Sequence, residues 1–159
     1  MTKFEITLLT NKNSPYLDTI NDWMYELWGA EEGWDMDKIN HYMQRFISAK
    51  TIPKTIIATT DGKIVGICNL LMHDLDTRPD LYPWAGNLFI DENYRGQGIS
   101  TLLMNELIGQ AKKLGLKELY SYTKQTSLCE KFGFKFLEET ETFNKPNAIE
   151  RLYKLDLIS

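Results

Sequence analysis

Apolar residues recur along the first third of the chain at two spacings, one typical of strands and one typical of helices. The range Phe4 to Leu9 alternates apolar and polar positions, which predicts a first strand. Ser14-Pro15 resembles a helix start, with Ser as N-cap and Pro in the first helical position. Gly29 is expected to end this helix. The apolar positions of this helix are Leu17, Ile20, Met24 and Leu27.

A second helix and a hairpin follow. Asp35 is placed to cap the helix, whose apolar stripe is Ile39, Tyr42, Met43, Phe46 and Ile47. The β-rich runs Thr55 to Thr60 and Lys63 to Met72 are joined by Asp61-Gly62, a dipeptide typical of tight hairpin turns.

The second half of the chain predicts a parallel crossover and a closing antiparallel pair. A strand at Ala85 to Ile90 leads through a glycine-bearing turn into a helix from about Gly98 to Leu114, which Gly115 ends. The remaining expected elements are a strand at Glu118 to Thr123, a short helix at Ser127 to Phe132, and strands at Phe134 to Glu139 and Ile149 to Leu157 around a turn containing Pro146. The order β-α-α-β-β-β-α-β-α-β-β predicts an α/β fold with one mixed sheet and a right-handed crossover, as a single domain over residues 1–159.

Composition narrows the functional classes. The 159 residues are 43% apolar and 25% charged, which is typical of a soluble globular protein. No apolar run reaches the ~18 residues of a membrane span, and the first residues lack a secretion signal, so we expect a cytoplasmic protein without a membrane partner. Two distant cysteines and two histidines predict no metal site, and a net charge of −4 argues against nucleic acid.

The turn between the Ala85 to Ile90 strand and the following helix carries the strongest chemical signal. Its sequence is Phe89-Ile90-Asp91-Glu92-Asn93-Tyr94-Arg95-Gly96-Gln97-Gly98-Ile99-Ser100. Glycines let the backbone approach a ligand, and amides at a helix start point outward toward negative oxygens. Arg95 adds a positive charge suited to phosphate. The turn predicts a diphosphate site, although the glycines are also explained by the geometry of a tight turn.

Two motifs resemble the GNAT acetyltransferase superfamily. The pattern Arg95-x-x-Gly98-x-Ser100 is similar to its Arg/Gln-x-x-Gly-x-Gly/Ala signature, with Ser100 as a departure. The segment Glu130-Lys131-Phe132-Gly133-Phe134 resembles its Tyr-Glu-Lys-x-Gly-Phe segment. The element order also matches from end to end, and the chain resembles small bacterial members of undefined substrate. The resemblance implies the GNAT fold with splayed central strands and an acetyl-CoA-dependent N-acetyltransferase in the cytoplasm.

The resemblance also implies where acetyl-CoA, the cosubstrate, binds. Backbone amides around the turn would hold the pyrophosphate, and the strand before it would pair with the pantetheine arm. An amide near Phe89 or Ile90 would polarise the thioester carbonyl. The expected cofactor-binding residues are Leu88, Phe89, Ile90, Arg95, Gly96, Gln97, Gly98, Ile99, Ser100 and Thr101.

Catalytic acid and base residues are less evident. The strand positions where family members commonly carry a base are Trp84, Gly86 and Asn87, none of which is basic, so we expect a relay through water or backbone carbonyls. Cys129 stands where the family has its acidic Tyr, and a helix start could lower the pKa of its thiol; it could equally be a packing residue. Tyr122 is a second candidate acid, with packing again as the alternative.

The acceptor is expected to be a small-molecule or peptidic amine, and acidic loops favour a cationic one. The candidate substrate-binding residues are Asp74, Glu31 and Trp84, although charged loops are commonly just solvated and several tryptophans are expected in the core. A coenzyme A-binding module without catalysis and an interaction domain without cofactor remain alternatives, and a homodimer is left open.

Overall fold

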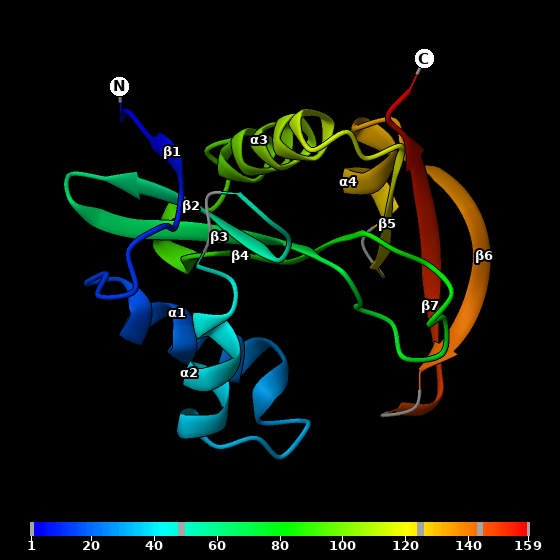
Figure 1. The fold of residues 1–159 in the computed structure, drawn as a ribbon, viewed down its shortest axis with the longest axis horizontal. Helices are drawn as coiled ribbons and strands as arrows, with labels where there is room; N and C mark the ends of the chain where they lie inside the picture. The colour runs from blue at the N-terminus through cyan, green and yellow to red at the C-terminus, as the bar shows by residue number, and fades with distance from the viewer. Residues whose placement is uncertain (1, 48–49, 124–125, 143–144, 159) are drawn as a thin grey trace. The chain divides into compact units, whose positions relative to one another are not determined.

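The computed structural model describes residues 2–47, 50–123, 126–142 and 145–158, and the chain has the predicted α/β fold with a mixed open sheet (Figure 1). Its strand order is β1-β2-β3-β4-β5-β7-β6. The strands are β1 Glu5–Leu8, β2 Lys54–Thr60, β3 Lys63–Leu71, β4 Trp84–Ile90, β5 Glu118–Thr123, β6 Lys135–Thr142 and β7 Lys145–Asp156. The α-helices are α1 Leu17–Met24, α2 Met36–Gln44, α3 Ile99–Lys113 and α4 Thr126–Lys131. The predicted element order is confirmed.

The chain divides into two compact units. The first unit comprises residues 1–69 and 87–107, and the second comprises residues 70–86 and 108–159. Within the described residues, no helix is long and apolar enough to cross a membrane.

The first unit is a layered structure around β1, β2, β3 and the end of β4. In Figure 1, α1 and α2 cover one face of these strands and the start of α3 covers the other. The predicted hairpin is confirmed, because Asp61 and Gly62 both have positive φ angles, 49° and 73°, at the turn between β2 and β3. On the α3 face, a side chain at Gly66 would meet Ile90, Ile99 and Leu103 at 3.0 to 3.1 Å, so glycine is what allows this close packing.

The predicted start of the first helix is wrong by two residues. The helix α1 begins at Leu17, and Ser14 instead accepts a hydrogen bond on Oγ from the Tyr16 amide at 3.2 Å, in a turn before the helix. The predicted apolar stripe also ends early. A π-helical segment, Tyr25–Gly29, follows α1 and shifts the phase of the helix, so that Leu27 is 40% exposed.

The second unit contains β5, β7 and β6 as an antiparallel set together with α4. The parallel ladder between β4 and β5 is limited, among the described residues, to Trp84 and Tyr120, which matches the expected separation of these strands. The turn predicted around Pro146 is wrong, because β7 already begins at Lys145.

The α2 N-terminus provides a direct test of the helix assignment. The Asp35 side chain accepts a hydrogen bond from the Lys38 amide at 2.8 Å, as the sequence predicts for an N-cap. We expect Asp35→Ala to lower the free energy of unfolding by about 1 kcal/mol, measured by denaturant titration. Asp37→Ala, which removes a first-turn carboxylate that caps no amide in the structure, should cost less than half of that. Equal losses in both variants would show that the helix dipole, rather than the cap, stabilises this end.

Candidate functional site

The turn from β4 into α3 reverses the chain with its backbone exposed. Gly96 and Gly98 have φ angles of 78° and 81°, a region that residues with a side chain adopt only under strain. A Cβ built on either glycine would find nothing within 4 Å. The first intrahelical bond runs from the Leu102 amide to the Gly98 carbonyl at 3.2 Å, so the amides of Gly98, Ile99 and Ser100 have no acceptor within the helix. This arrangement leaves room and donors for an anion.

The Arg95 side chain, which the sequence offers as a positive charge for phosphate, lies against the strand before the turn. Its Nε donates to the Ile90 carbonyl at 3.0 Å, and its guanidinium lies 5.8 Å from the centre of the Phe89 ring. The side chain therefore packs back along β4, while the remaining guanidinium nitrogens form no ion pair within the described residues.

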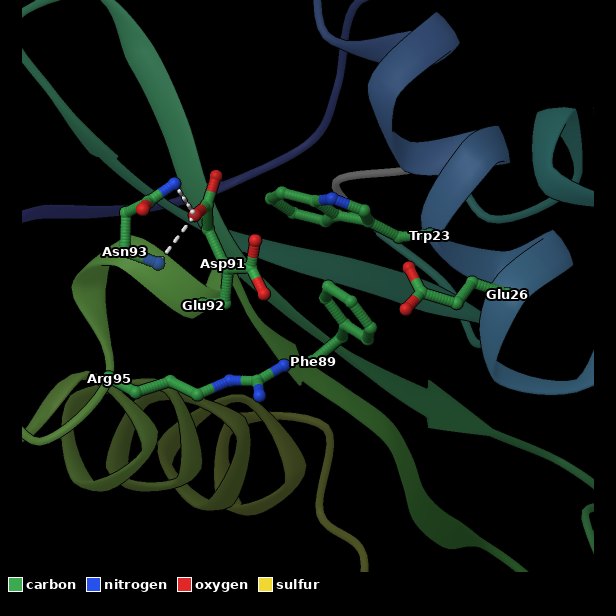
Figure 2. Close-up of a pocket in the computed structure, with 7 residues that line it drawn as sticks. All are labelled: Trp23, Glu26, Phe89, Asp91, Glu92, Asn93 and Arg95. Atoms are coloured by element: carbon green, nitrogen blue, oxygen red, sulfur yellow. Dashed lines mark hydrogen bonds between the residues drawn. The ribbon is translucent and has the colours of Figure 1, made fainter.

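A pocket of about 220 Å³ opens beside this turn, and Figure 2 shows the side chains around it. The Trp23 ring from α1 stacks on Phe89 with 5.1 Å between ring centres and 28° between planes. Asp91 caps the short turn that follows β4, since its Oδ1 accepts from the amide and the side-chain nitrogen of Asn93 at 2.9 and 3.1 Å. The pocket is lined by Trp23, Glu26, Phe89, Asp91, Glu92, Asn93 and Arg95.

The sequence identified only part of this pocket. Phe89 and Arg95 were expected at the cofactor turn, but Glu26 and Trp23 were not expected near it. A helical spacing of three residues between Trp23 and Glu26 would have been a signal that both side chains share a face. The pairing of Trp23 with Phe89 depends on how α1 packs on the strands, and no local pattern predicts that.

The second unit holds the two candidate acids. Tyr122 is half-buried, and its ring stands edge-on to Trp84, with 6.0 Å between centres. Cys129 is 7% exposed, and burial raises the pKa of its thiol, with a smaller lowering contribution from Ser121 and a raising one from Glu130. Of the two alternatives for Cys129, burial therefore favours the packing residue, because desolvation of the thiolate outweighs the influences that lower this pKa.

Trp84 lies in the core of the second unit and does not form an open aromatic wall. Its side chain is 0% exposed and its indole N–H donates to the Leu81 carbonyl at 2.7 Å. The burial does not support the prediction that this ring contacts a substrate.

Asp74 is half-buried and lies against β4. Its Oδ2 is 2.5 Å from the position that a Cβ on Gly86 would take, so the carboxylate fills the space of the missing side chain. The strand position where the sequence offered no base thus has a carboxylate beside it, supplied by the loop before the strand.

The loop that carries Asp74 is attached to β6. Arg78 pairs with Glu138 of β6 and with Asp80 at 2.8 Å, and the Thr77 hydroxyl donates to the Glu141 carbonyl at 2.8 Å. The hydrogen bond from Arg78 lowers the pKa of the Asp80 carboxyl. Asp80 therefore has a structural partner. Glu31, the other candidate for the acceptor, is exposed in the first unit between the π-helical segment and α2.

Comparisons with known proteins agree with the fold. The acetyltransferase (GNAT) domain family matches residues 52–136, more than half of the chain. An aminoglycoside 6′-acetyltransferase type Ii has a similar structure at 18% identity, with a TM-score of 0.74 and 98% of each chain covered. An aminoglycoside 6′-N-acetyltransferase complexed with coenzyme A is similar at 14% identity, with a TM-score of 0.76 and 98% of each chain covered. An N-acetyltransferase from Staphylococcus aureus is similar at 18% identity and a TM-score of 0.74, over 99% of this chain and 100% of that one.

The contact between Asp74 and Gly86 can be tested by stability. A Cβ at Gly86 would also lie 3.0 Å from Leu71 Cδ1, so we expect Gly86→Ala to lower the free energy of unfolding by ~1–3 kcal/mol through overpacking. Gly109→Ala is the control, because it lies within α3 with nothing within 4 Å and should be neutral or stabilising. Combining Gly86→Ala with Asp74→Ala should recover part of the loss. A fully stable Gly86→Ala protein would contradict this packing.

Proposed function

Because this chain belongs to the GNAT acetyltransferase family, we propose that it transfers the acetyl group of acetyl-CoA directly to an amine in a ternary complex. The observation that carries the proposal is the turn at the start of α3. Two glycines with positive φ, open space above both, and the amides of the first helical turn form a cradle for a diphosphate. The chemistry of this cradle fits the pyrophosphate of coenzyme A.

The cofactor would lie along the end of β4 and across the turn. Pyrophosphate oxygens would accept hydrogen bonds from the backbone around Gln97 to Thr101, next to Gly96 and Arg95. Arg95 Nε already occupies the Ile90 carbonyl, so the pantetheine arm would use the Leu88 carbonyl and the amides of Phe89 or Ile90. Acetyl-CoA supplies an activated thioester, and one of these amides would stabilise the negative oxygen that forms on its carbonyl.

The amine must be neutral when it attacks. An amine of pKa ~10 is only about 0.1% neutral at pH 7, so a proton has to leave before or during attack. The nitrogen forms a bond to the acetyl carbon, the carbon–sulfur bond breaks, and the thiolate takes up a proton. The strand offers no basic side chain at Trp84, Gly86 or Asn87, which favours a water relay for the first proton transfer.

The acceptor is proposed to be a small or peptidic amine that carries positive charge. Asp74 supports this, because its carboxylate lies beside β4, and Glu31 is an exposed carboxylate beyond the π-helical segment. A second candidate function is a coenzyme A-binding module without catalysis. It is favoured by Cys129, which is buried and stands where family members have the Tyr that acts as the general acid. Thiol release from acetyl-CoA over a panel of amines separates the two, since only the enzyme accelerates it.

Cofactor binding can be tested at Gly98 with a control of equal backbone strain. Gly98→Ala places a methyl group where phosphate must approach the amides, and we expect the Kd for acetyl-CoA to rise at least ~10-fold, about 1.4 kcal/mol. Gly115→Ala has a similar φ of 75° and open space at the end of α3, so it should suffer the same strain without the loss of affinity. Calorimetry on both folded variants measures this. An equal Kd in the two variants would remove the turn as the phosphate site.

The source of the proton for the leaving thiolate can be tested at Tyr122 and Cys129. We propose that Tyr122 donates it, because the Cys129 thiol is buried and its pKa is raised. Tyr122→Phe should lower kcat by ~10- to 100-fold with little change in the KM for acetyl-CoA. Cys129→Ala should leave kcat nearly unchanged and cost about 1 kcal/mol of stability. A Cys129→Ala enzyme with normal melting temperature and a large loss in kcat would identify the thiol as the acid instead.

A further inference from the structure

The pocket beside the turn has a charge that does not fit the cofactor. Three carboxylates, from Glu26, Asp91 and Glu92, line it together with one guanidinium, from Arg95. Three negative charges and one positive charge leave the lining at −2, which disfavours a phosphate group. Within the described part of the chain, Glu26 and Glu92 have no hydrogen-bond partner and no ion pair, and Arg95 is held by the Ile90 carbonyl instead.

The aromatic side of the pocket also suits a cation. Trp23 and Phe89 stack at 5.1 Å, and the electron-rich face of an aromatic ring attracts positive charge within about 6 Å. The Phe89 ring already has a cation near it, because the Arg95 guanidinium lies 5.8 Å from its centre. In Figure 2, Glu26 comes from the segment after α1 and Glu92 from the turn after β4, so acidic groups approach from two separate elements. Carboxylates, ring faces and about 220 Å³ of space together match a small ammonium group.

We propose that this pocket binds a protonated amine of the acceptor, and that this amine is not the one that is acetylated. Carboxylates close to an ammonium group stabilise its charged form and raise its pKa. A protonated amine has no lone pair with which to attack a thioester. The amine held between Glu26 and Glu92 is therefore an anchor, and the reacting amine is a second one on the same molecule.

This inference rests on the proposed acetyl transfer and specifies its substrate class. Phe89 belongs to both sites, because its ring lines the pocket while its backbone belongs to the strand proposed to hold the pantetheine arm. An acceptor anchored at the ring therefore has its other end free to reach the thioester. The preferred acceptors are molecules with at least two basic amino groups a few bonds apart.

The test compares two acceptors that differ in one charge. Putrescine has two amines on a four-carbon chain. The second acceptor, 4-aminobutan-1-ol, has the same chain with a hydroxyl group in place of one amine. Acetyl transfer to each is followed by thiol release, and the readout is the ratio of the two kcat/KM values. We expect the wild-type ratio to favour putrescine by at least ~10-fold, after correction for its two equivalent amines, and to fall as salt is raised.

The variants are Glu26→Gln, Glu92→Gln and their combination, with Asp18→Asn as the control. Asp18 is an exposed carboxylate on the same helix as Trp23 and does not line the pocket. Each pocket variant should lower the ratio about threefold, and the double variant about tenfold, as expected for exposed charge pairs. Asp18→Asn should leave it unchanged, and all four proteins should keep the wild-type Kd for acetyl-CoA. Asp91 is not changed, because it caps the turn.

The outcomes separate the inference from the proposed function. The proposed anchor is contradicted if both acceptors are acetylated without a preference for putrescine, or if the preference remains in the double variant. Either result is still consistent with the proposed acetyl transfer. If no amine accelerates thiol release, the proposed function fails. Calorimetry of putrescine binding to the wild type and the double variant then tests whether the pocket binds an ammonium group. Binding that weakens about tenfold in the double variant supports it, and equal binding overturns it.

Discussion

The reversal from β4 into α3 depends on two glycines in left-handed backbone conformations, Gly96 and Gly98. Both lie within three residues of Ile99, where α3 begins. These conformations aim the amides of the helix start outward instead of closing them against a side chain. The Asp91 amide makes a hydrogen bond to the Val65 carbonyl at 2.9 Å, so the turn leaves the sheet from a fixed point. The proposed phosphate site depends on this one change of direction.

The same strand takes part in both proposed binding sites. Its backbone is proposed to hold the pantetheine arm, whereas the Phe89 side chain packs on Trp23 and forms one side of an acidic pocket. Arg95 connects the two, because it bonds to the Ile90 carbonyl and lies over the Phe89 ring. The proposed phosphate site and the proposed ammonium pocket can lie close together, since the first uses partial charges of backbone amides and the second uses full charges of side chains.

In the second unit, the candidate residues are positioned by packing rather than by charge. Trp84 is enclosed, and Tyr122 stands against its edge. Burial raises the pKa of the Cys129 thiol and so disfavours the thiolate, the form on which cysteine reactivity depends. Of the acidic residues in the loop before β4, Asp80 is held by Arg78, whereas Asp74 occupies the space above Gly86. These two carboxylates therefore have different surroundings, although the sequence makes them look equivalent.

The sequence by itself determined the element order, the hairpin at Asp61-Gly62, the Asp35 cap and the glycine turn, because each depends on neighbours within a few residues. It failed at the start of the first helix and did not predict the π-helical segment, although that segment ends at Gly29 as expected. The helix begins two residues later than predicted, because Ser14 Oγ accepts from the Tyr16 amide in a turn before it, and the π-helical segment after Met24 alters the helical phase. Only the tertiary structure decided that Trp23 and Glu26 lie beside Phe89 and that Asp74 fills the space at Gly86. These contacts join residues far apart in the chain, and their geometry depends on how whole elements pack, which no local pattern of side chains specifies.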